Sequence, residues 1–598
     1  MNGRRRLVAA ALTGAAVLTG TIAAGGCAAS SAPHAVAACT VSHPTACVGI
    51  DLSRRDLRAW KFRGVDLRGA NLSRANLRGV DLRGARLDRA NFARADLRGA
   101  DLRDAGFATA ALEEADLRAA KLDGARFSAA RLAGADLRGA QLGMSFWTEA
   151  DLTGARGVQF DAGGVPFDGA CDTILPTGVV MGCAASMAAG APARAVPVTA
   201  SARPAVDLTR LVTRLVQRDR LNPPVASRVF AYTGIALTET AQPNSLQLTG
   251  VPTIPEPPTT VDWPVVVASG APLVPRALAL VPSTKSAYAS LRDDTLARLV
   301  RGVPPATARA SIEYGRGIAA QVIAWAGTDG FAATRDRKYV APVGSGLWVP
   351  TPTTFQGAQE PYWGTLRPFA VANAGQCAAP APPTYSEAAS SDFMTQERAV
   401  YDTSRRLTRD QRAIARFWAD DRGRTGTPTG HWVATANIAI TRRRLGLGDA
   451  ARLHGVIGVA AGDAFITTWA TKFQWNEIRP VTVIRKLIDP RWAPYLNTPP
   501  FPDWVSGHAA VSGAAAEVLT AIVGPMRYRD VGFGTGADVR ASFSIEPRSF
   551  PSFRAAAVQA AKSREYAGIH IPASDDEGLR SGACIGHAAL AARLATTK

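Results

Sequence analysis

Residues 65–84 read VDLRGANLSRANLRGVDLRG, and the same rhythm continues on both sides of this stretch. From Leu52 to Leu152 a large apolar residue recurs at every fifth position almost without a break, and alanine stands two positions before most of them. A period of five fits neither a helix nor a flat strand. It fits a square coil in which each repeat forms one side and points its large and small apolar residues inward. The sequence therefore predicts a rod of about twenty-one repeats in roughly five coils, about 25 Å long at the usual strand spacing.

The repeat resembles the pentapeptide-repeat family, A-(D/N)-L-x-x, as in Ala70-Asn71-Leu72 and Ala95-Asp96-Leu97. This resemblance implies a right-handed quadrilateral β-helix, which we expect over residues 38–158. Some members of that family are acidic DNA mimics that bind topoisomerases. The faces of this coil are charge-balanced to basic, so we do not carry that function over and expect no nucleic-acid partner.

Residues twenty apart should stack on one face of such a coil, and one stack is an unbroken arginine column: Arg58, Arg78, Arg98, Arg118 and Arg138. One interpretation is a ladder of donors for an anionic cell-envelope polymer or membrane headgroups. The other is a surface lattice of ion pairs, because an acid or asparagine stands two positions before each arginine: Asp56, Asn76, Asp96, Asp116 and Asp136. We favour the lattice.

The N-terminus has the pattern of a targeting segment over residues 1–37. Three arginines precede an apolar stretch from Leu7 to Ala24, followed by small residues. Processing at Cys27 would give a lipid-anchored protein, whereas processing after Ala37 would give a secreted one. We therefore predict export, and no later segment is long and apolar enough to be a transmembrane helix. The formal net charge is +19, or 19 − 3 = +16 without the three leader arginines, which favours anionic partners.

Six cysteines remain beyond the leader, an even number that suits an oxidising compartment. Proximity suggests the pairs Cys39–Cys47 and Cys171–Cys183, which leaves Cys377–Cys584 to tie the last domain, although the count alone allows 15 pairings. The second pair would close a cap over residues 159–186. An Ala/Pro-rich linker is expected over residues 187–206. The sequence contains no C-x-x-C pair, so a thiolate zinc site is not expected.

From residue 207 onward the pattern is helical, and the clearest helix boundaries fall near charged residues. Pro480 suits the first position of a helix. His508 opens an apolar-periodic run that Gly524 closes, and Ala555–Ala567 ends at Gly568.

These helix ends carry three short motifs: Lys472…Arg479-Pro480, Ser506-Gly507-His508 and Arg564…His570. Guanidinium groups match tetrahedral oxyanions with two hydrogen bonds, lysine adds a point charge, and a Ser-Gly pair at a helix start adds hydroxyl and amide donors. The sequence thus predicts a site for phosphate or a similar oxyanion.

The order and spacing of the motifs resemble the superfamily of vanadium-dependent haloperoxidases and type 2 phosphatidic acid phosphatases. Residues 479–485, RPVTVIR, and 498–502, TPPFP, are more similar to the haloperoxidases. The resemblance implies an all-α helical-bundle domain over residues 207–598. Two positions depart from the family pattern: Val505 replaces a proline, and Ser574 stands where an aspartate often follows the last histidine.

The resemblance also implies roles for individual residues. The expected ligands of vanadate oxygens are Lys472, Arg479, Ser506, the Gly507 amide and Arg564. His570 would bond the vanadium, His508 would act as acid and base, and Asp421 would orient the metal-ligating histidine. Trp469 and Phe501 match aromatic positions near the halide site.

The implied chemistry is oxidation of a halide by hydrogen peroxide to a hypohalous-acid equivalent that halogenates organic acceptors. If phosphate occupies the same residues, the alternative is a secreted acid phosphatase acting on a phosphomonoester, with His570 as nucleophile. A third hypothesis makes the protein an envelope-binding scaffold that works through the arginine column. The sequence leaves the choice of resident anion, halide and organic acceptor open.

Overall fold

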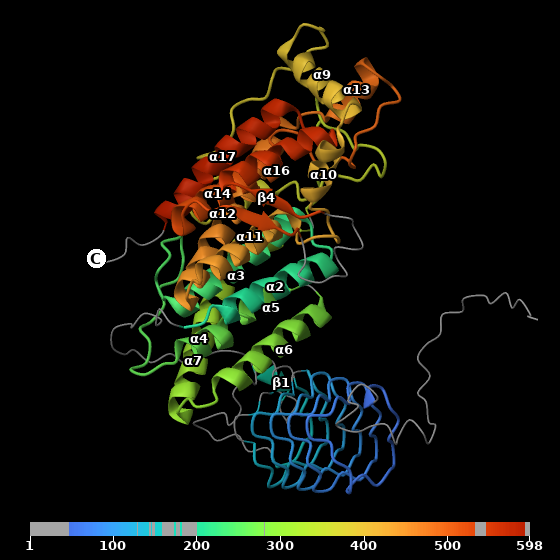
Figure 1. Ribbon diagram of the computed structural model, residues 1–598, viewed down its shortest axis with the longest axis vertical. Helices are drawn as coiled ribbons and strands as arrows, with labels where there is room; N and C mark the ends of the chain where they lie inside the picture. Colours follow the sequence, from blue (N-terminus) through green and yellow to red (C-terminus); the bar gives the residue numbers. More distant parts are fainter. Residues whose placement is uncertain are drawn as a thin grey trace, which may run out of the picture.

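The computed structural model describes residues 47–157, 173–174, 180–181, 200–532 and 546–592, except for positions 128, 143–144, 146, 148–149, 280 and 336. Figure 1 shows two parts: a coiled rod formed by the N-terminal residues, and a larger stack of helices formed by the rest of the chain. The predicted leader lies outside the described residues.

The rod is a β-helix with twenty residues per coil. Its bridges join positions twenty apart, from Asp51↔Asn71 to Asp136↔Arg156, and a new bridge follows about every five residues. Nearly all the fifth-position side chains are fully buried, Leu72, Leu97 and Leu117 among them, as are most of the small residues two positions earlier. This confirms the four-sided coil that the five-residue period predicts.

Aromatic side chains continue the stack inside the last coils. The rings of Phe107 and Phe127 lie 4.8 Å apart at 9°, and those of Phe127 and Trp147 lie 4.1 Å apart at 12°. Such parallel stacks form because identical positions of successive coils lie directly above one another.

Between the two parts, a short antiparallel pair joins β1 (Thr173–Ile174) to β2 (Val180–Met181). The cysteines of the predicted cap, Cys171 and Cys183, lie outside the described residues, as does Cys39, whereas Cys47 is disulfide-bonded. The predicted linker ends earlier than expected, because helix α2 (Arg203–Arg218) already begins at Arg203 with Pro204 in its first turn.

The second part is helical, as predicted. Its first helices are α2, α3 (Pro223–Ala241), α4 (Trp263–Gly270), α5 (Leu273–Leu278), α6 (Pro282–Leu299), α7 (Pro305–Ala326), α8 (Phe331–Thr334) and the 3-10 turn η2 (Trp363–Thr365). The following elements are α9 (Asp392–Arg405), α10 (Arg409–Phe417), α11 (Thr427–Arg443), α12 (Leu447–Trp475), α13 (Pro480–Leu487), α14 (Gly507–Val523), β3 (Tyr528–Asp530), β4 (Arg548–Phe550), α16 (Phe553–Ala567) and α17 (Pro572–Ala591). Strands β3 and β4 pair antiparallel.

Helix α14, which starts at the Ser-Gly-His motif, packs very closely against α17. A Cβ added to Gly582 would lie 2.1 Å from the Ala510 carbonyl oxygen, and one added to Gly578 would lie 2.8 Å from that of Ser506. Only glycine permits this approach. The disulfide Cys377–Cys584, one of the predicted pairs, further ties α17 to the segment before α9.

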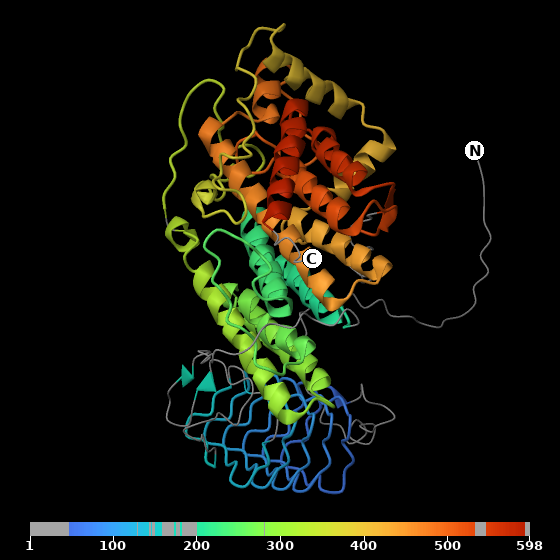
Figure 2. The same cartoon turned by 90° about the vertical axis from the view of Figure 1, so that its left-hand side faces the viewer.

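The rod lies against the end of the helical part that carries α6 and α7 (Figures 1 and 2). Two ion pairs cross the junction: Arg126 to Asp294 at 2.7 Å and Arg301 to Asp104 at 3.0 Å. None of the helices in the described part of the chain is long and apolar enough to cross a membrane.

Candidate functional site

Helix ends bring the predicted oxyanion-binding residues together. Lys472 lies in the last turn of α12, and Arg479 and Ser506 are the residues that precede α13 and α14. Arg564 lies in the last turn of α16, and His570 follows that helix just after Gly568. All five of these side chains are buried. We call the group of Lys472, Arg479, Ser506, Gly507, Arg564 and His570 the cage.

The turn at Gly568 aims His570 into the cage. Gly568 has φ +76°, and a Cβ at this position would lie 3.1 Å from the Pro494 backbone. Both the left-handed conformation and the tight space favour glycine.

Arg479 is the most connected residue of the cage. Its Nε donates to the Phe501 carbonyl at 2.8 Å, and its Nη1 donates to the Ile569 carbonyl at 2.7 Å. Nη1 also lies 3.1 Å from Asp503 Oδ1 and 3.3 Å from His570 Nε2. The remaining nitrogen, Nη2, is buried without a hydrogen-bond partner among the described residues. Burial lowers the pKa of Arg479 to about 10 although Asp503 opposes the shift, so a nearby anion would relieve a real electrostatic cost.

Lys472 adds a second buried cation. Its Nζ donates to the carbonyls of Pro502 at 2.8 Å and Asp503 at 2.7 Å, and lies 5.1 Å from the centre of the Phe501 ring. Burial and the charge of Arg479 lower the pKa of Lys472 well below its ordinary value. Binding an oxyanion would favour the charged ammonium.

Neighbouring side chains hold His570 through its ring nitrogen Nδ1. Its Nδ1 lies 2.7 Å from Asp503 Oδ1 and 3.2 Å from Ser574 Oγ. Burial lowers the pKa of His570 to about 3, against the opposing effect of Asp503. The ring is therefore neutral near pH 7. With the Nδ1 proton donated to Asp503, Nε2 carries the lone pair that a metal ligand needs.

His508 and Arg564 lie on the remaining side of the cage. Burial, with the charge of Arg564, lowers the pKa of His508 well below its ordinary value, so this ring is also neutral. The Arg564 Nη1 donates to the Trp418 carbonyl at 2.8 Å. His508 Nε2 and Arg564 Nε are buried without hydrogen-bond partners among the described residues. These atoms and Arg479 Nη2 are donors or acceptors left for a ligand.

Asp421 does not have the predicted contact with His570. Its side chain is 51% exposed and lies 4.0 Å from Arg424 Nη1. The carboxylate on His570 belongs to Asp503, a residue that the motif analysis missed. A buried charge was foreseeable from its place in the apolar stretch PDWV directly before Ser506, because an acid in such a stretch usually has a charged partner.

A second unpredicted cluster lies behind His508. Asp420 Oδ2 is 3.7 Å from His508 Nε2, and Asp420 Oδ1 is 3.0 Å from His431 Nδ1. His431 Nε2 lies 3.2 Å from Asp530 Oδ2, and the Trp418 ring stacks on it at 4.3 Å. Burial opposes ionisation, but Asp420 and Asp530 prevail and raise the pKa of His431 to about 10. These residues form a buried ion-pair cluster that none of the three sequence motifs includes.

A cavity of about 660 Å³ reaches the cage and is lined in part by Gly507, His508, Arg564 and His570. The two aromatic residues predicted for a halide site, Trp469 and Phe501, also line it, with ring centres 4.8 Å apart. The structure thus places every predicted cage residue and both aromatic residues in one neighbourhood.

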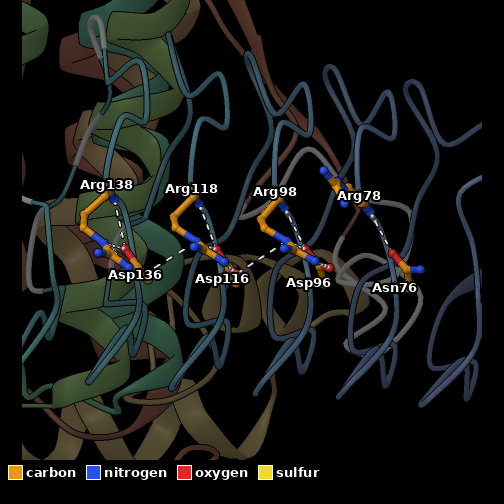
Figure 3. Close-up of polar contacts among 8 residues, drawn as sticks. All are labelled: Asn76, Arg78, Asp96, Arg98, Asp116, Arg118, Asp136 and Arg138. Carbon is orange, nitrogen blue, oxygen red and sulfur yellow. Dashed lines mark hydrogen bonds and ion pairs between the residues drawn. The ribbon is translucent and has the colours of Figure 1, made fainter.

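The arginine column of the β-helix is largely paired. Arg98, Arg118 and Arg138 each meet the acid two positions earlier at 2.5–2.6 Å, and weaker contacts of 3.6–3.8 Å link successive coils (Figure 3). Arg58 pairs with Asp56 in the same way, and the Arg78 amide donates to Asn76. This geometry favours the ion-pair lattice over a ladder of unengaged donors.

Comparisons with known proteins agree with both parts of the chain. A family model described as VCPO second helical-bundle domain matches residues 452–596, and a pentapeptide-repeat model matches residues 50–87, 66–104 and 110–154. The vanadium chloroperoxidase of Curvularia inaequalis is 31% identical over 134 residues, which cover 18% of this chain and 22% of that relative.

Among solved structures, that of the first bacterial vanadium-dependent iodoperoxidase is 33% identical, with a TM-score of 0.60. The match covers 67% of this chain and 98% of the iodoperoxidase. The match therefore spans nearly the whole of that relative. The chain belongs to the vanadium-dependent haloperoxidase family and carries an N-terminal pentapeptide-repeat region.

Proposed function

We propose that this protein is a vanadium-dependent haloperoxidase that uses hydrogen peroxide to oxidise halide, and that the oxidised halogen then reacts with organic acceptors. The proposal rests chiefly on one observation: two buried arginines, Arg479 and Arg564, leave unpaired donors beside a neutral buried histidine. Membership of the family supports the same reading.

The residues present fit vanadate. Arg479 Nη2 and Arg564 Nε are orphaned buried donors, and such groups are costly unless a ligand satisfies them. Lys472, Ser506 and the Gly507 amide would complete the set that holds the oxygens, and His570 Nε2 would be the protein ligand of the metal. When bound, vanadate supplies a Lewis acid that activates hydrogen peroxide toward halide.

The remaining roles fall to side chains of this chain. The overall reaction, X⁻ + H₂O₂ + H⁺ → HOX + H₂O, consumes a proton, so the site needs a group that exchanges protons at the cage. His508 is neutral and its Nε2 has no hydrogen-bond partner among the described residues, which suits it to accept a proton from peroxide and to return it. Asp503 favours the tautomer of His570 whose Nε2 carries the lone pair; this lone pair faces Arg479 Nη1 at 3.3 Å and would turn to the metal when vanadate binds.

Trp469 and Phe501 would form the wall against which the halide approaches. Lys472 and Arg479 lie over the Phe501 ring at 5.1 and 5.0 Å, so the aromatic wall is electropositive. An apolar wall backed by cations suits a weakly hydrated anion such as bromide or iodide.

Vanadate-dependent bromination tests the proposal. Purified protein would be assayed with peroxide, bromide and a phenol-type dye, with and without added orthovanadate. We expect bromination only with vanadate, and His570→Ala should abolish it while leaving the fold intact. His587→Ala is the matched control, because His587 is 68% exposed and lies away from the cage. Full activity in His570→Ala would contradict the proposal.

The same preparation should be tested for hydrolysis of p-nitrophenyl phosphate without vanadate. Phosphate release that vanadate inhibits, together with no bromination, would make the protein a phosphatase acting through the same cage. That outcome would replace the haloperoxidase proposal.

A further inference from the structure

Exposed apolar side chains gather in one segment beside the cavity. Seven large hydrophobic residues are exposed in the described parts of the chain: Val48, Val340, Val343, Val349, Phe355, Trp475 and Val558. Four of them lie between residues 340 and 355. Val343 is 99% exposed, Val340 87% and Phe355 63%. Single exposed apolar residues are ordinary, but a group within one loop marks an interaction surface. We call residues 340–355 the apolar loop.

The loop is anchored, so its exposure is not a sign of poor packing. The Tyr339 hydroxyl donates to Asn476 Oδ1 at 2.7 Å, and the Trp348 amide donates to the Asn476 carbonyl at 2.7 Å. Both ends of residues 340–347 are thus fixed to the residue that follows α12, and the Trp348 side chain is buried. Val340 and Val343 lie in the closed loop between these anchors. Trp475, which is 37% exposed, immediately precedes Asn476.

A basic segment adjoins the loop. Arg335, Arg337 and Lys338 lie just before it, separated from the loop by Tyr339, and all three are exposed. Asp336 stands among them, so residues 335–338 carry a formal charge of 3 − 1 = +2. The Arg337 guanidinium lies 3.9 Å from the centre of the Tyr362 ring, a contact that orients the charge but does not neutralise it. Exposed valine and phenylalanine next to clustered arginine and lysine is the composition of segments that bind the interface of anionic membranes.

We propose that the apolar loop and its basic flank dock the protein on an anionic lipid surface. The apolar side chains would enter the headgroup boundary and the cations would contact lipid phosphates. A second copy of the chain is the less suitable occupant, because each copy has a net charge of +19 and presents the same basic flank.

Docking would also bring the cavity to the membrane. Pro352, Thr354 and Gln356 line the cavity, and Phe355 stands between two of them. In Figure 2 the chain between α8 and η2, in yellow-green, runs along the outer edge of the helical part. The lipid surface therefore meets the protein at the cavity mouth, where compounds dissolved in the bilayer could enter.

Vesicle flotation tests this proposal with the chain from Ala38 onward, which contains every described residue and lacks the apolar leader. The probes are vesicles of phosphatidylglycerol and phosphatidylcholine in equal parts, and vesicles of phosphatidylcholine alone. We expect binding to the first and at least tenfold weaker binding to the second. The triple variant Val340→Ser, Val343→Ser, Phe355→Ser should lose at least tenfold in partition to the anionic vesicles. A second triple variant, Arg335→Gln, Arg337→Gln, Lys338→Gln, should lose binding and its salt dependence together.

Val558→Ser is the matched control, because Val558 is 58% exposed on α16, outside the loop, and its binding should equal that of the parent. Circular dichroism would verify that each variant is folded. The proposal is overturned if the parent does not bind anionic vesicles, or if the apolar triple variant binds as well as the parent. It is also overturned if that variant instead changes the sedimentation mass, which would identify the loop as a contact between two copies.

Discussion

Arg479→Lys separates the shape of the arginine from its charge. The substitution keeps one positive charge in the cage but replaces a planar group of five donors with a single ammonium. Arg479 Nε and Nη1 donate to two backbone carbonyls, and Nη2 is left for a ligand. A lysine cannot serve these three positions together, so the charge-assisted bond to the oxyanion should be lost.

A hydrogen bond to a charged group contributes about 1.5–3 kcal/mol. Losing one should weaken vanadate binding by about 10- to 140-fold, since about 1.4 kcal/mol corresponds to a factor of ten. Leaving one buried carbonyl, that of Phe501 or Ile569, without its donor should also lower the free energy of unfolding by about 1–3 kcal/mol.

Isothermal titration with orthovanadate measures the affinity directly, and urea unfolding without vanadate measures the stability. Arg485→Lys is the control, because Arg485 lies in the same helix α13 and its Nε donates to the Trp492 carbonyl at 2.7 Å, away from the cage. If Arg479→Lys binds vanadate within threefold of the parent, or if Arg485→Lys weakens binding equally, the assignment of Nη2 to the oxyanion is wrong.

Three further predictions concern buried groups outside the cage. Burial lowers the pKa of His454 to about 3, so between pH 6.5 and 3 the unfolded chain binds one more proton than the folded chain, and stability falls as the pH falls. His454→Leu should remove about 1.4 kcal/mol per pH unit of this loss. An unchanged dependence of the urea midpoint on pH would contradict this prediction. The effect of pH on stability has the opposite sign for His431, because its pKa is raised to about 10. Its contribution to stability is complete below pH 6.5 and is lost as the pH rises through 10. The His431→Gln variant should therefore be less stable at pH 7, and its free energy of unfolding should fall less steeply between pH 7 and 10. Phe127→Ala should destabilise the β-helix by about 3–5 kcal/mol, because Phe127 is fully buried between the rings of Phe107 and Trp147; calorimetry should show an earlier transition for this part, and an unchanged trace would refute the stacked core.

Local sequence patterns predicted several features because each depends on neighbouring residues alone. The five-residue period fits a coil with one repeat per side, since inward and outward positions then recur at every repeat, and the resemblance to the pentapeptide-repeat family implies the four sides. Pro480, Ser506 and Gly568 lie at the helix boundaries where their backbone preferences place them. The Cys377–Cys584 pair, 207 positions apart, is not a local feature, and the cysteine count only allowed it as one of 15 pairings.

The partner of His570 could not be predicted in this way. Asp421 and Asp503 are both acids near the motifs, and no spacing rule distinguishes a carboxylate that faces a ring nitrogen from one that faces solvent. Asp503 reaches His570 only because the segment before α14 passes between α13 and the turn after α16. The His431 cluster could not be predicted either, because its two acids, Asp420 and Asp530, are 110 positions apart (530 − 420) and meet only through tertiary packing.

The sequence by itself determined the coil, the helix ends and the identity of the cationic residues, because these follow from periodicity and from the chemistry of single side chains. The tertiary structure alone decided which charges meet. It left Arg479 and Arg564 with unpaired donors, gave His570 its carboxylate, and paired most of the arginine column with acids. The physical reason is that the energy of a charge depends on its burial and on its neighbours within a few ångströms, and neither is a local property of the chain.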